Sequence, residues 1–167
     1  MIIGNKICEL AEGMTIDVDG NTIEVKNTFG DQEALDKFIK EFDKRSLDKF
    51  PLIFVLIAKT IGEKMYSSKR QIVIMASTNA NWLSKDRTAN RFVKVIDPIY
   101  KKLIPIIDKD KQLKIVGDFK TRVEYTDKPN YGVSDSGISK KKSKESTITD
   151  YIDARLIDLE IEYRPNC

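Results

Sequence analysis

Two long segments, residues 113–125 and 148–163, alternate between apolar and polar side chains. A period of two residues is typical of β-strands with one buried face. At about 3.3 Å per residue the two strands would reach roughly 43 and 53 Å. A compact chain of 167 residues is only about 40 Å across. We therefore expect residues 113–163 to form a long β-hairpin arm that protrudes from the body or bends sharply.

The second of these segments changes its apolar face partway along. The apolar residues are at even positions up to 156 (Ile152, Ala154 and Leu156) and at odd positions from Ile157 onward. An extra residue in one strand of a pair produces such a change. The pattern therefore predicts a β-bulge at Leu156-Ile157.

The connection between the two segments, residues 126–147, is 22 residues long. A connection of this length is usually functional or disordered. It carries Lys140, Lys141, Lys142 and Lys144. Four of the 29 Lys and Arg and one of the 26 Asp and Glu lie in residues 138–149, so the rest of the chain carries 25 of each sign. The whole net charge of +3 therefore belongs to residues 138–149, at the tip of the predicted hairpin. This tip is either a solvated loop or a basic finger that contacts an acidic partner or a nucleic acid.

The rest of the chain predicts both helices and strands. Asp19-Gly20, flanked by alternating apolar residues, predicts a hairpin. An apolar stripe over residues 84–108 predicts a helix with Ser84 as its N-cap, and Asp97-Pro98 predicts either a kink or a second helix capped by Asp97. Other helices are expected at residues 2–12 and 31–44, and strands buried on both faces at residues 50–57 and 71–78. We expect an α+β fold, a single domain over residues 1–167, with a mixed or antiparallel sheet packed by helices.

The composition excludes several classes of site and protein. Hydrophobic residues make up 41% of the chain, enough for a core, and there is no histidine for acid–base catalysis or zinc binding. Cys8 and Cys167 lie near opposite ends and are expected to be free thiols in a reducing cytosol. The longest apolar run has 9 residues, too short to span a bilayer. We expect a soluble protein without membrane contact.

No arrangement of residues indicates catalysis. Ser46/Lys49 and Ser139/Lys142 have the Ser-x-x-Lys spacing, but both pairs lie in charged stretches where a neutral lysine is not expected. We therefore expect no enzyme activity, no cofactor and no metal. Trp82, the single tryptophan, is either a core anchor or an interface residue.

Several short motifs, in order along the chain, resemble a known group of proteins. They are Phe50-Pro51-Leu52-Ile53, Ala76-Ser77-Thr78, Trp82-Leu83-Ser84-Lys85-Asp86-Arg87, Val95-Ile96-Asp97-Pro98-Ile99-Tyr100, Pro129-Asn130-Tyr131-Gly132, Asp150-Tyr151-Ile152-Asp153-Ala154 and the final cysteine. They are similar to structural proteins of tailed phages of Bacteroidetes, the crAss-like phages among them. The likeness covers roughly residues 50–167 and consists of packing residues.

The resemblance implies a subunit of a ring at the neck of the virion, in the head–tail connector or the tail-completion complex. Its implied partners are further copies of itself, six or twelve in a ring, the neighbouring portal, neck or tail proteins, and DNA passing through the lumen. Such a protein is made in the host cytoplasm and ends in the virion. The candidate contact residues are Lys140, Lys141, Lys142, Lys144, Tyr131, Trp82 and Arg87.

Two other interpretations remain open from the sequence. The basic loop is compatible with a nucleic-acid-binding accessory protein, which would lose affinity steeply as salt rises. An enzyme of unrecognised type would have to use carboxylates and lysines alone.

Overall fold

Helices and strands alternate along the chain in the computed structural model, which describes residues 2–40, 50–57, 67–79, 82–117, 123–129, 131 and 150–164. The helices are α1 (Ile2–Ala11), α2 (Gln32–Lys40) and a continuous helix of three parts, α3 (Ser84–Arg87), η2 (Thr88–Ile96) and α4 (Asp97–Lys109). The strands are β1 (Thr15–Val18), β2 (Asn21–Glu24), β3 (Lys26–Gly30), β4 (Leu52–Leu56), β5 (Ser67–Asn79), β6 (Leu113–Ile115), β7 (Glu124–Lys128) and β8 (Asp150–Tyr163).

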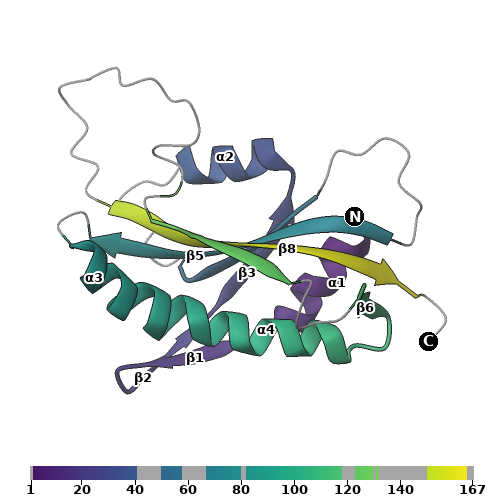
Figure 1. Ribbon diagram of the computed structural model, residues 1–167, viewed down its shortest axis with the longest axis horizontal. Coiled ribbons are helices and arrows are strands. Elements are labelled where there is room, and N and C mark those ends of the chain that lie inside the picture. The colour runs from purple at the N-terminus through teal and green to yellow at the C-terminus, as the bar shows by residue number, and fades with distance from the viewer. Residues whose placement is uncertain are drawn as a thin grey trace.

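A mixed sheet runs through the middle of the described residues (Figure 1). Its strand order is β3-β4-β5-β8, and both β6 and β7 pair with the outer edge of β8. β3 and β4 are parallel, whereas all the other pairs are antiparallel. The described residues thus form one compact α+β domain with a mixed sheet, as the sequence predicts.

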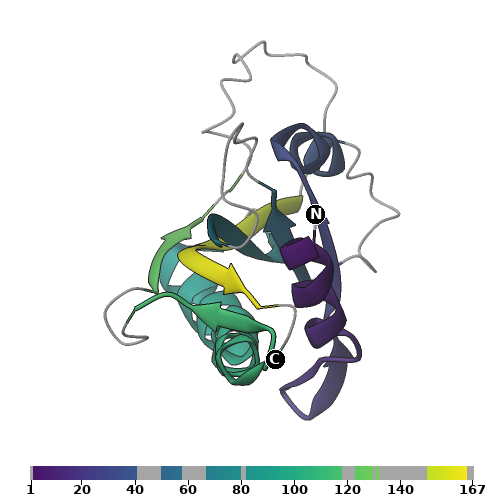
Figure 2. The same ribbon diagram turned by 90° about the vertical axis from the view of Figure 1, so that its right-hand side faces the viewer.

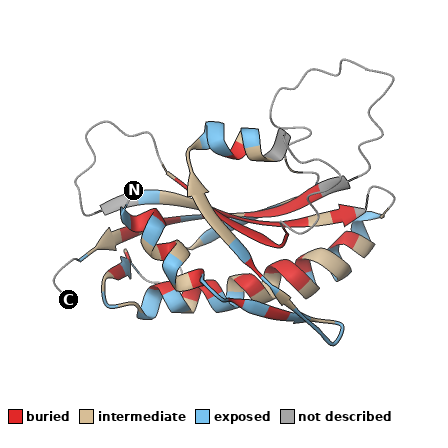
Figure 3. Ribbon diagram, turned by 180° about the vertical axis from the view of Figure 1, so that it is seen from behind, coloured by how far each residue is buried: buried red, intermediate tan, exposed pale blue. Residues whose placement is uncertain are grey.

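Two apolar clusters cover the two faces of this sheet. The larger cluster packs α1 and the long helix against Ile53, Ile74 and Ile157. The smaller one packs α2 against Phe54, Met75 and other side chains of the opposite face. Figure 2 shows the long helix and α2 on opposite sides of the strands. In Figure 3 the buried positions gather on the central strands and on the sheet-facing side of the long helix.

The hairpin predicted at Asp19-Gly20 is confirmed. β1 and β2 pair antiparallel, and both turn residues have positive φ, 49° and 84°, as a two-residue turn of this kind requires. Lys94 holds the tip by donating to the Asp19 carboxylate at 2.8 and 3.0 Å. The hairpin is therefore attached to the long helix.

Strand β4 confirms the prediction of a strand buried on both faces, since each of its residues is buried. Its parallel neighbour β3 was missed by the sequence analysis. Its sequence KNTFG has no apolar alternation, and the strand forms because its backbone pairs with β4 while Phe29 packs in the larger cluster. Tertiary pairing overrides local preference at this strand.

The long helix differs from expectation at its start and at Pro98. The N-cap is Leu83, without a side-chain bond, so the prediction for Ser84 is wrong by one residue. Asp97 has helical φ and ψ and does not cap a new helix. Its N–H bonds instead to the carbonyl of Phe92, the i→i−5 pattern of a π-helix. Proline cannot donate the next helical bond, and the wider turns before it let the helix continue through Pro98.

The segment 113–125 does not form one strand. It contributes β6 and the start of β7, with Gly117 at φ 99° after β6. Nor does β8 leave the body as half of an arm, because it pairs with β5 over 13 residues and lies inside the sheet. The described strands are therefore not a free-standing arm. Residues 132–149, with most of the tip loop, lie outside the described residues.

The predicted bulge at Leu156-Ile157 is absent, because the register of β5 with β8 continues unchanged across it. Ile152 and Ala154 face the smaller cluster, whereas Ile157 and Leu159 face the larger one. The apolar residues therefore move from one face of β8 to the other at this point, and the strand contains no extra residue there. Two charged residues, Asp153 and Arg155, take the positions facing the long helix in the first half of β8.

Candidate functional site

Asp153 and Arg155 are buried charged residues on one face of β8, 0% and 4% exposed. They lie two residues apart, so both side chains project toward the long helix. A buried charge is costly unless it is paired and hydrogen-bonded. Each of the two has acquired partners from other elements of the fold.

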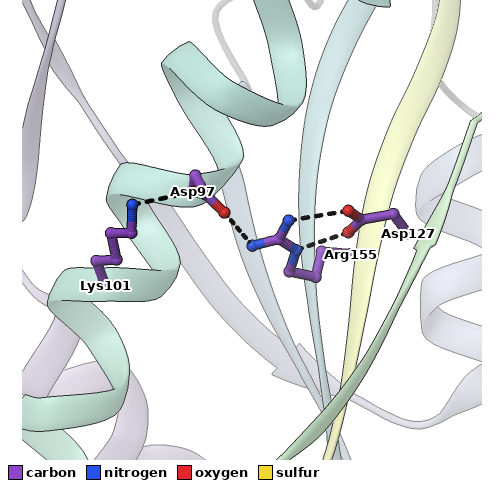
Figure 4. Close-up of polar contacts among 4 residues, drawn as sticks. All are labelled: Asp97, Lys101, Asp127 and Arg155. Carbon is purple, nitrogen blue, oxygen red and sulfur yellow. Dashed lines mark hydrogen bonds and ion pairs between the residues drawn. The ribbon is translucent and has the colours of Figure 1, made fainter. Parts of the chain in front are cut away.

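Arg155 lies between two carboxylates (Figure 4). Its Nε and Nη2 donate to the two oxygens of Asp127 on β7, at 2.6 and 2.9 Å. Its Nη1 donates to Asp97 on α4 at 2.5 Å, and Lys101 lies 3.1 Å from the other Asp97 oxygen. This Arg155 cluster joins an outer strand, a central strand and the long helix. The two-bond contact with Asp127 also fixes the plane of the guanidinium.

Two tyrosine rings complete the Arg155 cluster. The guanidinium carbon lies 4.1 Å from the centre of the Tyr125 ring and 5.3 Å from that of Tyr100. The two rings are 5.3 Å apart and tilted. Cation–π attraction therefore adds to the ion pairs, and Tyr125 holds β7 against β8 although about half of Tyr125 is exposed.

The surroundings shift the pKa values in the cluster. Burial alone lowers the pKa of Arg155, but the hydrogen bonds from its guanidinium to Asp127 and Asp97 outweigh burial and raise it above its ordinary value. Burial likewise opposes the charge of Asp97, yet the bonds from Arg155 and Lys101 hold the pKa of that carboxyl below its ordinary value. Burial, with the nearby Tyr125, raises the pKa of Tyr100. Arg155 and Asp97 are thus held in their charged forms.

Asp153 is paired with Arg87 of α3 in a second, more enclosed contact. Arg87 Nη1 donates to Asp153 Oδ1 at 3.2 Å, and its Nε donates to the carbonyl of Trp82 at 3.2 Å. The two side chains are only 8% and 0% exposed. Arg91, one turn further on, donates to the carbonyl of Ser77 and lies 4.6 Å above the Trp82 ring. Burial lowers the pKa of Arg91, and the charge of Asp153 opposes this shift.

Three of the candidate contact residues can now be placed. Arg87 and Trp82 lie together, and both take part in internal contacts at the start of the long helix. Tyr131 lies elsewhere, packed against the smaller cluster, with its N–H donating to the carbonyl of Ile152 at 2.7 Å. The four lysines of the tip loop, Lys140, Lys141, Lys142 and Lys144, lie outside the described residues.

The residues that form the Arg155 cluster are not evident from the sequence patterns. Asp97-Pro98 predicts a helix cap at Asp97, and no motif includes Arg155 or Asp127. A signal was present, because Asp153 and Arg155 occupy positions where continued alternation calls for apolar side chains. We interpreted that signal as a bulge.

A shallow polar hollow lies beside α1. It measures about 350 Å³ and is lined by Asn5, Cys8, Glu9, Glu12 and Asn27. Burial raises the pKa of the Cys8 thiol to about 11, so the thiol stays protonated at neutral pH. Cys8 has no disulfide partner among the described residues, which do not include Cys167.

Within the described ranges, no three His, Cys, Asp or Glu side chains are grouped to hold a metal ion. In the same part of the chain no helix is both long and apolar enough to cross a membrane. No protein-family model matches the sequence, and no curated protein matches it.

Proposed function

We propose that this protein is a structural subunit of a ring in the head–tail connector or tail-completion complex of a tailed phage. The observation that carries the proposal is the Arg155 cluster. It joins β7, β8 and α4 through ion pairs and leaves β7 as an exposed outer strand. The motifs that resemble the phage group contribute Asp97 and Tyr100 to this cluster.

A ring built from one kind of subunit needs two different, complementary surfaces on each copy. The outer strand β7 supplies one surface, together with the part of the 126–147 connection that follows it in the sequence. This part of the chain takes the role that the sequence analysis gave to a hairpin arm. Lys140, Lys141, Lys142 and Lys144 are its proposed contacts with an acidic neighbour or with DNA. The assembled ring would contact portal, neck or tail proteins in the virion.

Native mass spectrometry of the purified chain, over a range of concentrations and with virion neck components, tests this proposal. We expect closed oligomers of about six or twelve copies. A chain that stays monomeric alone and never joins neck components would overturn it. Binding to DNA that weakens steeply with salt, without oligomers, would favour the accessory role instead.

Two variants of the connection sharpen the test. Deletion of residues 132–146 should leave a folded monomer that cannot enter the assembly. The matched variant keeps the length and replaces Lys140, Lys141, Lys142 and Lys144 with Gln. If this variant also fails to assemble, charge carries the contact, whereas normal assembly shows that other residues carry it. Full incorporation of the deletion variant would contradict a role of the connection in assembly.

A further inference from the structure

β7 is held on the sheet with little apolar burial. Its first four residues are exposed and Lys128 is half-buried, whereas all residues of β4 are buried. The contacts that attach β7 include backbone pairing with residues 154–158 of β8, the contacts of Asp127 and Tyr125 with Arg155, and the ring contact of Tyr125 with Tyr100. Segments with few buried apolar contacts are the ones that open at low free energy. β7 is thus the described strand best suited to leave the sheet as a unit.

If β7 left the sheet, the exposed edge of β8 would accept only a strand with particular side chains. This edge runs from Ala154 to Asp158 and includes the Arg155 guanidinium, still paired with Asp97. It requires an extended segment with a carboxylate directly opposite Arg155. It also favours an aromatic ring two residues earlier, on the same face of the strand. The sequence Tyr125-Thr126-Asp127 meets both requirements.

The chain has the length to let β7 move. Ile115 lies opposite Ile161 and Glu124 lies opposite Asp158, so the two pairs are about 10 Å apart along β8. The chain between Ile115 and Glu124 could reach about 30 Å if extended. After β7 in the sequence, a longer stretch of chain separates Lys128 from Asp150. Within this stretch, Tyr131 is held by its contacts with Ile152 and the smaller cluster. The movable unit therefore runs from β7 to Tyr131.

We propose that β7 is exchanged between copies of this chain, so that the β7 of one copy pairs with the β8 edge of the next and its Asp127 binds the neighbour's Arg155. The segment that leaves one copy has the chemistry that the vacated edge of another copy accepts, which makes strand exchange a low-cost route to assembly. Each subunit then has one donor strand and one acceptor edge, the two different surfaces that a ring requires. The inference deepens the proposed function and rests on it for the assembly in which exchange takes place.

Cysteine pairs test the exchange in the full-length chain, with Cys8→Ser and Cys167→Ser as background. A Glu124→Cys chain is mixed with an Asp158→Cys chain under conditions of assembly and oxidised. These positions are directly opposite and exposed, so the two chains form a disulfide only if β7 of one pairs with β8 of the other. The matched control mixes Lys69→Cys and Glu160→Cys chains, whose positions are opposite in the central β5–β8 pair. We expect covalent dimers from the first mixture only. Equal yields from both would overturn the exchange.

A locked monomer gives the second measurement. The double variant Glu124→Cys/Asp158→Cys, oxidised while dilute, fixes β7 on its own β8. We expect native mass spectrometry to show loss of the oligomers and recovery of them after reduction. If the locked chain assembles as the wild type does, exchange is refuted while the ring function stands. A wild-type chain that forms no oligomer and joins no neck component would contradict both.

Discussion

The Arg87–Asp153 pair and the Arg155 cluster are neighbours on β8, but they differ in how far their side chains are exposed to solvent. In the Arg87–Asp153 pair both side chains are enclosed, at 8% and 0% exposure. In the Arg155 cluster only the arginine is enclosed, while Asp97 and Asp127 remain 29% and 35% exposed. The first pair attaches α3 to the centre of the sheet, and the second attaches the outer strand and α4.

The difference determines what happens when each contact is broken. A buried charge that loses its partner has no water to replace it, and the fold bears most of the desolvation cost. A carboxylate that is one-third exposed can take up water instead. The Arg87–Asp153 pair is therefore suited to fix one geometry, whereas the Arg155 cluster is suited to open and close.

Breaking the enclosed pair should give the largest effect. Arg87→Met leaves Asp153 charged in the interior and should lower the free energy of unfolding by about 3–5 kcal/mol, measured by denaturant titration. The control Lys85→Met changes an exposed lysine of the same helical turn and should stay within about 0.5 kcal/mol. Equal effects of the two variants would contradict the comparison.

Removing the central cation of the open cluster should cost less. Arg155→Met leaves two carboxylates that water can reach, and we expect a loss of about 2–3 kcal/mol in unfolding free energy. Arg164→Met is the matched control, because Arg164 pairs with Glu162 at the surface and its loss should cost under about 1 kcal/mol. A loss from Arg155→Met as large as that from Arg87→Met would show that the cluster is not open to solvent.

Asp127→Asn should weaken β7 alone. The neutral amide keeps the shape but loses the charge-assisted bonds, so the local opening free energy of β7 should fall by about 1–2 kcal/mol. Hydrogen exchange would show faster exchange at residues 124–128 and unchanged rates in β5. Glu124→Gln, on the other face of β7, should leave the exchange rates of both β7 and β5 unchanged. Faster exchange throughout the sheet would contradict separate opening of β7.

Acid should produce the smallest effect. The pKa of Asp97 in the folded chain lies below its unfolded value, ordinarily about 3.9, so its charge contributes stability above that pH. The contribution is lost as pH falls through the lower, folded pKa. Between pH 6 and pH 3 the unfolding free energy of Asp97→Asn should therefore fall less than that of the wild type. Glu33→Gln, which removes an exposed carboxylate of α2, is the control and should follow the wild type.

Much of the fold could be predicted from local patterns. Asp19-Gly20 specifies a two-residue turn through its positive φ values, and the apolar run at Leu52–Leu56 specifies a strand covered on both faces. The apolar stripe of the long helix correctly predicted the burial of Phe92, Ile96, Ile99, Leu103, Ile104 and Ile107, but two members of the stripe, Ala89 and Val93, are exposed. In these cases a few adjacent residues, or a regular spacing, contain most of the information that the local structure needs.

The candidate site could not be predicted in the same way. Arg155 meets Asp97 and Asp127 from 58 and 28 residues away, and Arg87 meets Asp153 across 66 residues. The alternation shows that Asp153 and Arg155 interrupt an apolar face, but it does not show which residues pair with them. Only the pairing of β8 with β5 on one side and β7 on the other brings these charges together. Local backbone preference and apolar spacing are enough to predict most helices and the apolar strands, whereas β3 and the separation of β6 from β7 depend on strand pairing in the folded chain. The tertiary structure alone decided where the buried charges find partners, because an ion pair depends on distance in space.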